Sequence, residues 1–191
     1  GRHLSEFEMM GHHVFNNPTE ELYWKDDTVR YCNGLMVDDL GIPAETITYR
    51  EDPWFGGGNA GPALEVLVGG LELATLVFMN MIKHPMGNIE IGGDKYRKMD
   101  TYIVDTGYGL ERFVWMSSGA PTLYEAIYPE LIREIFDAQS IEHDLNDEEY
   151  RAMIGGHVNL CGQIDISTPA HLMEMRKRLS KELKQKGYDV S

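Results

Sequence analysis

The segment from Val104 to Arg112 has the residue types and spacing of a phosphate-binding turn. It reads Val-Asp-Thr-Gly-Tyr-Gly-Leu-Glu-Arg and predicts an apolar strand that passes through a Gly-x-Gly turn into a helix. Glycines at 107 and 109 would let the backbone bend and approach a ligand closely. A helix beginning near Gly109 would direct free N–H groups at an anion, and Arg112 would add a bidentate donor from its first turn.

The same segment also has a plainer interpretation. A lone Gly-x-Gly motif is weak evidence for a ligand site. Arg112 stands where a dinucleotide-binding loop needs its third glycine, so a Rossmann fingerprint is excluded. Taken by itself, the segment fits an ordinary strand-to-helix turn as well as it fits a phosphate site.

Several strands must position this segment. Residues 3–10 alternate in a way that predicts a strand, and residues 46–50 predict another. The glycine-rich stretch from Pro53 to Pro62 predicts a working loop. The apolar runs at 63–68 and 71–82 are typical of buried strands, and Gly92-Gly93 predicts a hairpin before the run that ends at Asp105.

Helical patterns occupy residues 19–40 and most of the chain after Pro121. Capping boxes are indicated at Thr122 with Glu125, and from Asn146 to Glu149. The stretch from Pro169 to Gly187 has apolar residues at three- and four-residue steps, which predicts one amphipathic helix. We therefore expect two domains, at residues 1–119 and 120–191.

Composition narrows the possible classes of protein. No run approaches the length of a membrane span, and the first residues lack the apolar stretch of a signal peptide, so we expect a cytoplasmic protein. Cys32 and Cys161 have no CxxC spacing, which favours free thiols. A net charge of −14 argues against a general polyanion-binding surface.

Together these motifs resemble the catalytic core of alanyl-tRNA synthetases, closest to the archaeal form. VDTGYGLER is similar to the family's version of class II motif 3, and RHLSEFEMMGHH resembles the second half of motif 2. PWFGGGNAGPALEV followed by LELATLVFMN resembles the amino-acid-pocket loop and strand. The resemblance implies an α+β fold, with part of a class II antiparallel sheet, flanking helices and the start of a helical tRNA-recognition region.

The resemblance implies two substrate sites. ATP would contact Arg2, His3, Phe7, Met9, Gly107, Gly109 and Arg112, with Phe7 stacked on adenine. Alanine would contact Trp54, Thr75, Asp105 and Gly107, with the Asp105 carboxylate on the α-ammonium. Arg2, Arg112 and Asp105 would then be the catalytic residues. Thr75 stands where many family members carry Asn, which leaves its contact open.

Some of these residues have structural alternatives. An isolated Phe7 is by default a core residue, Trp54 could be a hydrophobic plug in its loop, and Asp105 could cap the following helix. Adjacent His12 and His13 should point to opposite faces of a strand, so local packing or hydrogen bonding is favoured over metal binding.

Two carboxylates are candidates for binding Mg²⁺ beside the phosphates. They are Glu65 and Glu72, since Mg²⁺ favours one or two carboxylates together with phosphate oxygens. Glu72 falls in a buried-looking strand, so it should have a cation or hydrogen-bond partner.

The last predicted helix is locally basic. Arg176, Arg178 and Lys181 belong to a patch that could contact a tRNA acceptor stem, although the helix taken alone favours an ordinary solvated face.

The resemblance implies ATP-dependent activation of alanine and its transfer to tRNA(Ala), by a chain that is a fragment of the enzyme and whose activity alone is left open. The start without Met fits a fragment. Two alternatives remain: a paralogue that charges an acceptor other than tRNA, and a non-catalytic nucleotide-binding module.

Overall fold

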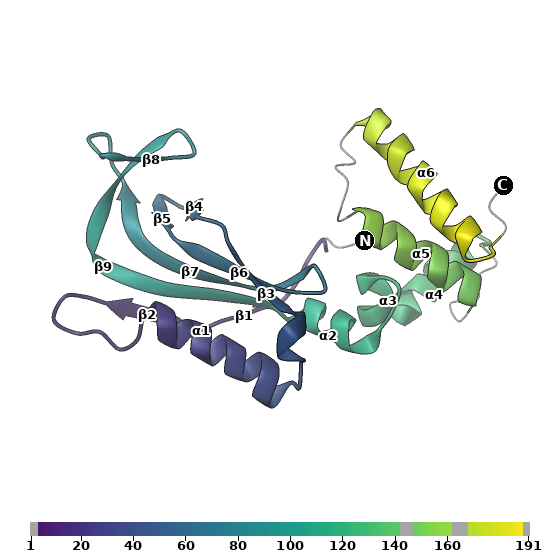
Figure 1. Cartoon of the computed structure of the whole chain (residues 1–191), viewed down its shortest axis with the longest axis horizontal. Helices are drawn as coiled ribbons and strands as arrows, with labels where there is room; N and C mark the ends of the chain where they lie inside the picture. Colours follow the sequence, from purple (N-terminus) through teal and green to yellow (C-terminus); the bar gives the residue numbers. More distant parts are fainter. Residues whose placement is uncertain (1–3, 142–146, 162–167, 189–191) are drawn as a thin grey trace. The chain divides into compact units, whose positions relative to one another are not determined.

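The structure, a computed structural model, describes residues 4–141, 147–161 and 168–188. It divides into two compact units (Figure 1). One unit is the β-rich stretch Glu8–Leu110, called here the sheet unit. The other comprises Glu111–Ser191 with Gly1–Phe7 and is called the helical unit.

The sheet unit contains a nine-stranded sheet in which every paired strand is antiparallel. Strand β9 lies between β7 on one side and the short strands β1 and β2 on the other. The strands are β1 (Met9–Met10), β2 (His13–Asn16), β3 (Ile47–Glu51), β4 (Trp54–Gly56), β5 (Asn59–Gly61), β6 (Ala63–Val68), β7 (Leu71–Lys83), β8 (Ile89–Ile91) and β9 (Asp94–Gly109).

Glycine pairs make the tight turns between neighbouring strands. Gly57-Gly58, Gly69-Gly70 and Gly92-Gly93 all have positive φ, the backbone conformation that two-residue hairpins require. The β8–β9 hairpin expected at Gly92-Gly93 is therefore confirmed. The stretch 53–62 is not the open loop that its composition predicts, because β4 and β5 pair across its glycines.

The sheet unit has one face packed against helix α1 (Lys25–Gly34), which runs along the sheet in Figure 1. The Trp24 ring, just before this helix, meets the Phe78 and Tyr102 rings edge-on at centroid distances of 5.4 and 4.9 Å. Phe78, Leu76 and Val104 are almost completely buried. The even-numbered residues of central β7 and β9 therefore form the packed face, and the odd-numbered residues form the opposite face.

A buried polar cluster lies on the face of the sheet that meets α1. Burial raises the pKa of the Cys32 thiol, while its hydrogen bond with Tyr108 acts in the opposite direction. Burial also raises the pKa of Tyr108 well above its usual range, and it raises the pKa of Tyr49 to about 12. These three groups are therefore held in their protonated forms at neutral pH.

The helical unit consists of short helices joined by capped turns. Thr122 and Glu125 form the predicted capping box, and Thr168 caps the last helix by accepting from His171 N at 3.3 Å. Leu179 on α6 packs close to Gly156 on α5. The helices are α2 (Leu110–Ser118), α3 (Leu123–Ile127), α4 (Pro129–Ala138), α5 (Glu148–Cys161) and α6 (Pro169–Gln185).

Two details differ from the expectations from sequence. The strand expected at 3–10 includes only Met9–Met10 among the described residues. The observed cap of α5 is Asp147, whose Oδ1 accepts from Tyr150 N at 2.8 Å; Asn146 lies outside the described residues. Within the described ranges, no helix is long and apolar enough to cross a membrane.

Alkaline titration should destabilise the sheet unit through Tyr49. Its pKa in the folded chain is about 12, above the ordinary value of 10.0, so the folded state holds the phenolic proton more tightly. This contribution to stability is present below pH 10 and is lost as the pH rises toward 12. Tyr49→Phe should therefore flatten the loss of unfolding free energy over this window, measured by urea denaturation at a series of pH values.

The control for this experiment is Tyr31→Phe, because the Tyr31 ring on α1 is 54% exposed. An equally steep alkaline loss in the Tyr49→Phe and unmutated chains would contradict the assignment.

Candidate functional site

Polar residues form a row across the sheet face opposite α1. In the antiparallel register, Arg50 lies opposite Glu65, Glu65 opposite Thr75, and Thr75 opposite Gly107. Directly paired residues point to the same face of a sheet, so this row is shared by β3, β6, β7 and β9. Thr75 and Gly107, expected at the alanine site, are thus brought side by side.

Asp105 lies on the same face, one residue pair along β9 from Gly107. It pairs with Val77 on one side and with His13 on the other. His13 Nδ1 lies 2.7 Å from Asp105 Oδ1, and the two side chains are 59% and 36% exposed. Asp105 therefore ends in an accessible carboxylate that is held by a neighbouring strand.

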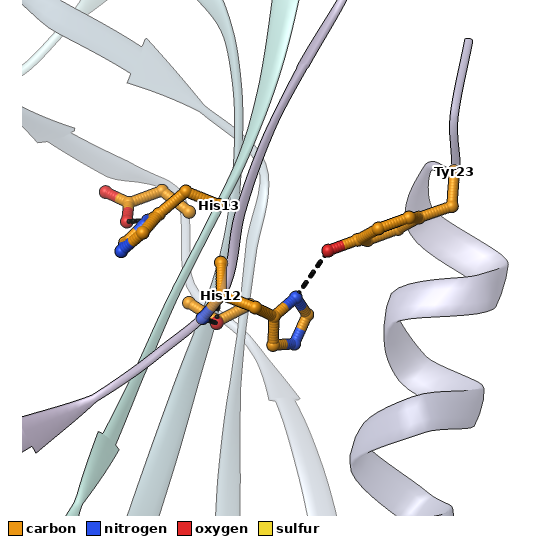
Figure 2. A network of polar contacts seen from close by, with 5 residues as sticks. His12, His13 and Tyr23 are labelled. Atoms are coloured by element: carbon orange, nitrogen blue, oxygen red, sulfur yellow. Dashed lines mark hydrogen bonds and ion pairs between the residues drawn. The ribbon is translucent and has the colours of Figure 1, made fainter.

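His12 and His13 point to opposite sides of their chain segment (Figure 2). His12 Nδ1 lies 2.6 Å from the Tyr23 hydroxyl, and its Nε2 lies 3.4 Å from the Tyr108 hydroxyl. Desolvation by burial, followed by the charge of His13, lowers the pKa of His12 and favours a neutral ring. The expectation that both histidines have local hydrogen-bonding roles is confirmed.

Trp54 packs on the Asp105 face of the sheet. Its indole contacts the cluster of Ala63, Val77 and Met79, and Ile103 joins the same cluster. The ring also lies so close to Gly56 that a Cβ there would approach the indole to 2.8 Å. The apolar wall predicted for the alanine methyl group thus packs on the cluster that contains Val77, the residue that pairs with Asp105, although Trp54 itself is on β4, with β5 and β7 between it and β9.

The Met9 side chain lies over Gly107. A Cβ built on Gly107 would come within 2.7 Å of Met9 Sδ, and Met9 itself is 59% exposed. Gly109 pairs with Met9 in the register of β1 and β9. Gly107 and Gly109 are therefore strand residues, and the predicted Gly-x-Gly turn is wrong: the strand continues to Gly109 and the helix begins at Leu110.

The two candidate Mg²⁺ carboxylates flank Thr75. Glu65 forms an ion pair with Arg50, and Thr75 Oγ1 donates to Glu72 Oε1 at 2.6 Å. The hydrogen-bond partner expected for Glu72 is thereby found. Two carboxylates fit the donor set of Mg²⁺, which binds one or two carboxylates together with phosphate oxygens. Within the described ranges, no group of three or more potential ligands is present.

The remaining candidate ATP residues are in or near the helical unit. Arg112 is in the first turn of α2 as predicted, and the Phe7 ring is 58% exposed rather than in a core. Arg2 and His3 lie outside the described residues. A shared cavity for Phe7 and the 107–112 segment stays a prediction, as does the domain boundary at 119/120.

The basic patch predicted at the end of the chain lies on α6. Arg176, Arg178 and Lys181 are exposed, while Met175 and Leu183 are buried. Arg178 Nε lies 3.2 Å from Glu174 Oε1, so one of these cations is partly offset within the helix. The amphipathic helix is confirmed, and its role toward RNA stays a prediction.

Two partners of site residues were not predicted from the sequence: His13 for Asp105 and Arg50 for Glu65. Both pairs join different strands, and their register is set by pairing that the sequence does not show. The sequence offered one indication of these partners: β2 and β3 each carry a basic or titratable residue that could pair with a carboxylate on another strand.

The antiparallel sheet and the family comparison define the class of protein. A family model described as tRNA synthetases class II (A) matches residues 1–187. The chain belongs to this family, and the fold class expected from its motifs is confirmed.

Individual relatives are proteins named alanine–tRNA ligase. The one from Methanothrix thermoacetophila is 55% identical over 183 residues, covering 96% of this chain and 20% of that protein. The one from Methanococcoides burtonii is 53% identical over 180 residues, covering 94% and 19%. The one from Archaeoglobus fulgidus is 53% identical over 180 residues, covering 94% and 20%. The chain thus spans about a fifth of the length of these relatives.

A pair of glycine substitutions tests the packing at the site. Gly11→Ala should destabilise the sheet unit by about 1–3 kcal/mol, because the new Cβ would lie 2.2 Å from the Thr106 carbonyl oxygen, a backbone atom. Gly107→Ala should cost less, because the Met9 thioether that it meets can move aside. Urea unfolding of both variants measures the difference, and a larger loss for Gly107→Ala would contradict this arrangement.

Proposed function

We propose that this chain is the amino-acid-activating part of an alanine–tRNA ligase, and that the whole protein joins alanine to tRNA(Ala) using ATP. The observation that supports the proposal is the sheet face on which Asp105, Thr75, Gly107 and Trp54 lie together. The names of relatives at 53–55% identity agree with it.

The proposed alanine site consists of the Asp105 carboxylate, the backbone at Gly107 and the Trp54 indole. The Asp105 carboxylate binds the α-ammonium, since it is accessible and a carboxylate favours a charge-assisted bond. Gly107 contributes backbone beside it, and Trp54 with its apolar cluster bounds the methyl group.

ATP binds next to this site through the residues of the two motif-like segments. Phe7 stacks on adenine. Met9, whose thioether lies over Gly107, contacts the nucleotide as well. Arg112, with Arg2 and His3, binds the phosphates, and Gly109 lets the backbone approach them. Mg²⁺, held by Glu65 and Glu72, would neutralise phosphate charge when bound.

Activation requires positioning rather than a covalent enzyme nucleophile. The alanine carboxylate attacks the α-phosphorus of ATP, the bond to the β-phosphate oxygen breaks, and pyrophosphate leaves. Negative charge builds on the phosphate oxygens, so cations such as Arg112 stabilise the transition state. The adenylate then transfers alanine to the 3′ end of tRNA, and Arg176, Arg178 and Lys181 on α6 would contact its acceptor stem.

Replacement of Arg112 tests this function in the full-length protein that contains the chain. Arg112→Ala should lower alanine-dependent ATP–pyrophosphate exchange at least about 100-fold, because a preorganised cation is lost from the phosphates. The matched control is Arg133→Ala, since Arg133 is exposed on α4 and has no proposed role. Both variants should unfold at the temperature of the unmutated protein.

Three results would count against the proposal. Near-normal exchange in Arg112→Ala would remove Arg112 from the site. Exchange with alanine but no tRNA-dependent turnover would favour a paralogue that uses another acceptor. ATP binding without exchange would favour a non-catalytic nucleotide-binding module.

A further inference from the structure

We propose that His13 is a positioning residue for amino-acid binding: its Nδ1–H orients the Asp105 carboxylate toward the substrate ammonium. This inference rests on the proposed function, because it deepens the role of Asp105. His13 itself has no proposed contact with alanine or ATP.

The direction of the hydrogen bond follows from the chemistry of the pair. An ionised carboxylate only accepts hydrogen bonds, so His13 Nδ1 must be the donor at its 2.7 Å distance from Asp105 Oδ1. This assignment fixes Nδ1 as protonated in either the neutral or the charged ring. A carboxylate has acceptor capacity on both oxygens, so Asp105 Oδ2 remains able to accept from an ammonium.

Orientation matters here because Asp105 is accessible. Its side chain is 36% exposed, and a free carboxylate on a sheet surface can rotate about its side-chain bonds. The hydrogen bond from His13 removes that freedom before the substrate arrives. A preoriented acceptor loses less entropy on binding, which increases affinity.

His13 can act in this way because the preceding residue is fastened to the same stretch of β9. His12 N donates to Thr106 Oγ1 at 2.8 Å, and Thr106 Oγ1 donates to His12 O at 2.9 Å. Thr106 N also donates to His12 O at 3.3 Å. Thr106 directly follows Asp105, so the backbones that carry His13 and Asp105 are tied together in one register.

The ring of His12 supplies a second attachment on the opposite face. It contacts the Tyr23 and Tyr108 hydroxyls, and Tyr108 is nearly buried. The two histidine rings therefore have different roles. The His12 ring points toward Tyr23 and anchors the segment there, whereas the His13 ring points the other way (Figure 2). In that position the His13 ring holds the Asp105 carboxylate.

A matched pair of substitutions separates positioning from simple packing. In His13→Asn the side-chain amide nitrogen can take the place of Nδ1, whereas in His13→Gln the amide nitrogen extends toward the place of Nε2. In the full-length protein, His13→Gln and His13→Ala should raise the KM for alanine about 10-fold in pyrophosphate exchange, as loss of a supporting hydrogen bond does. His13→Asn should restore most of the affinity, and the KM for ATP should not change in any of them.

The control breaks another exposed ion pair of the same sheet. Lys83 Nζ and Asp94 Oδ2 are 2.8 Å apart, with side chains 54% and 45% exposed. Lys83→Ala should leave the KM values for alanine and ATP unchanged. This result would show that loss of an exposed ion pair on this sheet does not by itself weaken alanine binding. Asp105→Asn should raise the KM for alanine at least as much as His13→Gln.

The outcomes distinguish the two proposals. Equal alanine KM values for His13→Asn and His13→Gln, with Asp105→Asn still impaired, would overturn the positioning role and leave the proposed function standing. The positioning role would also be overturned if the His13 variants lost exchange activity with both substrates and unfolded at a lower temperature. That result would mean that His13 only contributes to packing. Absence of alanine-dependent exchange in the unmutated protein would overturn the proposed function and this inference with it.

Discussion

The antiparallel pairing of β9 with its neighbours is the constraint on which the rest of the site depends. Because side chains alternate between faces with a period of two, the register decides that Asp105 and Gly107 face away from α1 while Thr106 and Tyr108 face toward it. A slip of one residue would exchange the two sets, burying the carboxylate and exposing the core. The buried Phe78, Leu76 and Val104 make such a slip costly.

The two faces of the sheet are chemically different. The face against α1 carries aromatic edges and protonated tyrosine and cysteine groups, whose raised pKa values keep it uncharged. The opposite face carries the hydrogen-bonded pair of Asp105 with His13 and the ion pair of Glu65 with Arg50. Both carboxylates lie on the face away from α1, so neither has to be desolvated by that helix.

Much of the fold could be predicted from local sequence. Apolar runs bounded by glycines indicated β6 and β7, Gly92-Gly93 indicated its hairpin, and Thr122 with Glu125 indicated a helix cap. Predictions from local sequence were wrong where strand pairing outweighs the tendency of glycine to form turns and loops. The glycine-rich stretch around Gly57-Gly58 became a hairpin, and Gly107 and Gly109 remained in a strand, because hydrogen bonds to neighbouring strands stabilise extended backbone there.

The sequence by itself determined the residue types of the site and the family, since VDTGYGLER and the motif-2-like segment are contiguous and need no folding to be recognised. Only the tertiary structure decided which of those residues are neighbours. The His13–Asp105 bond, the Arg50–Glu65 pair and the position of Met9 over Gly107 join segments far apart in the chain. Their physical cause is strand register, which is set by the packing of the whole sheet and not by any local pattern.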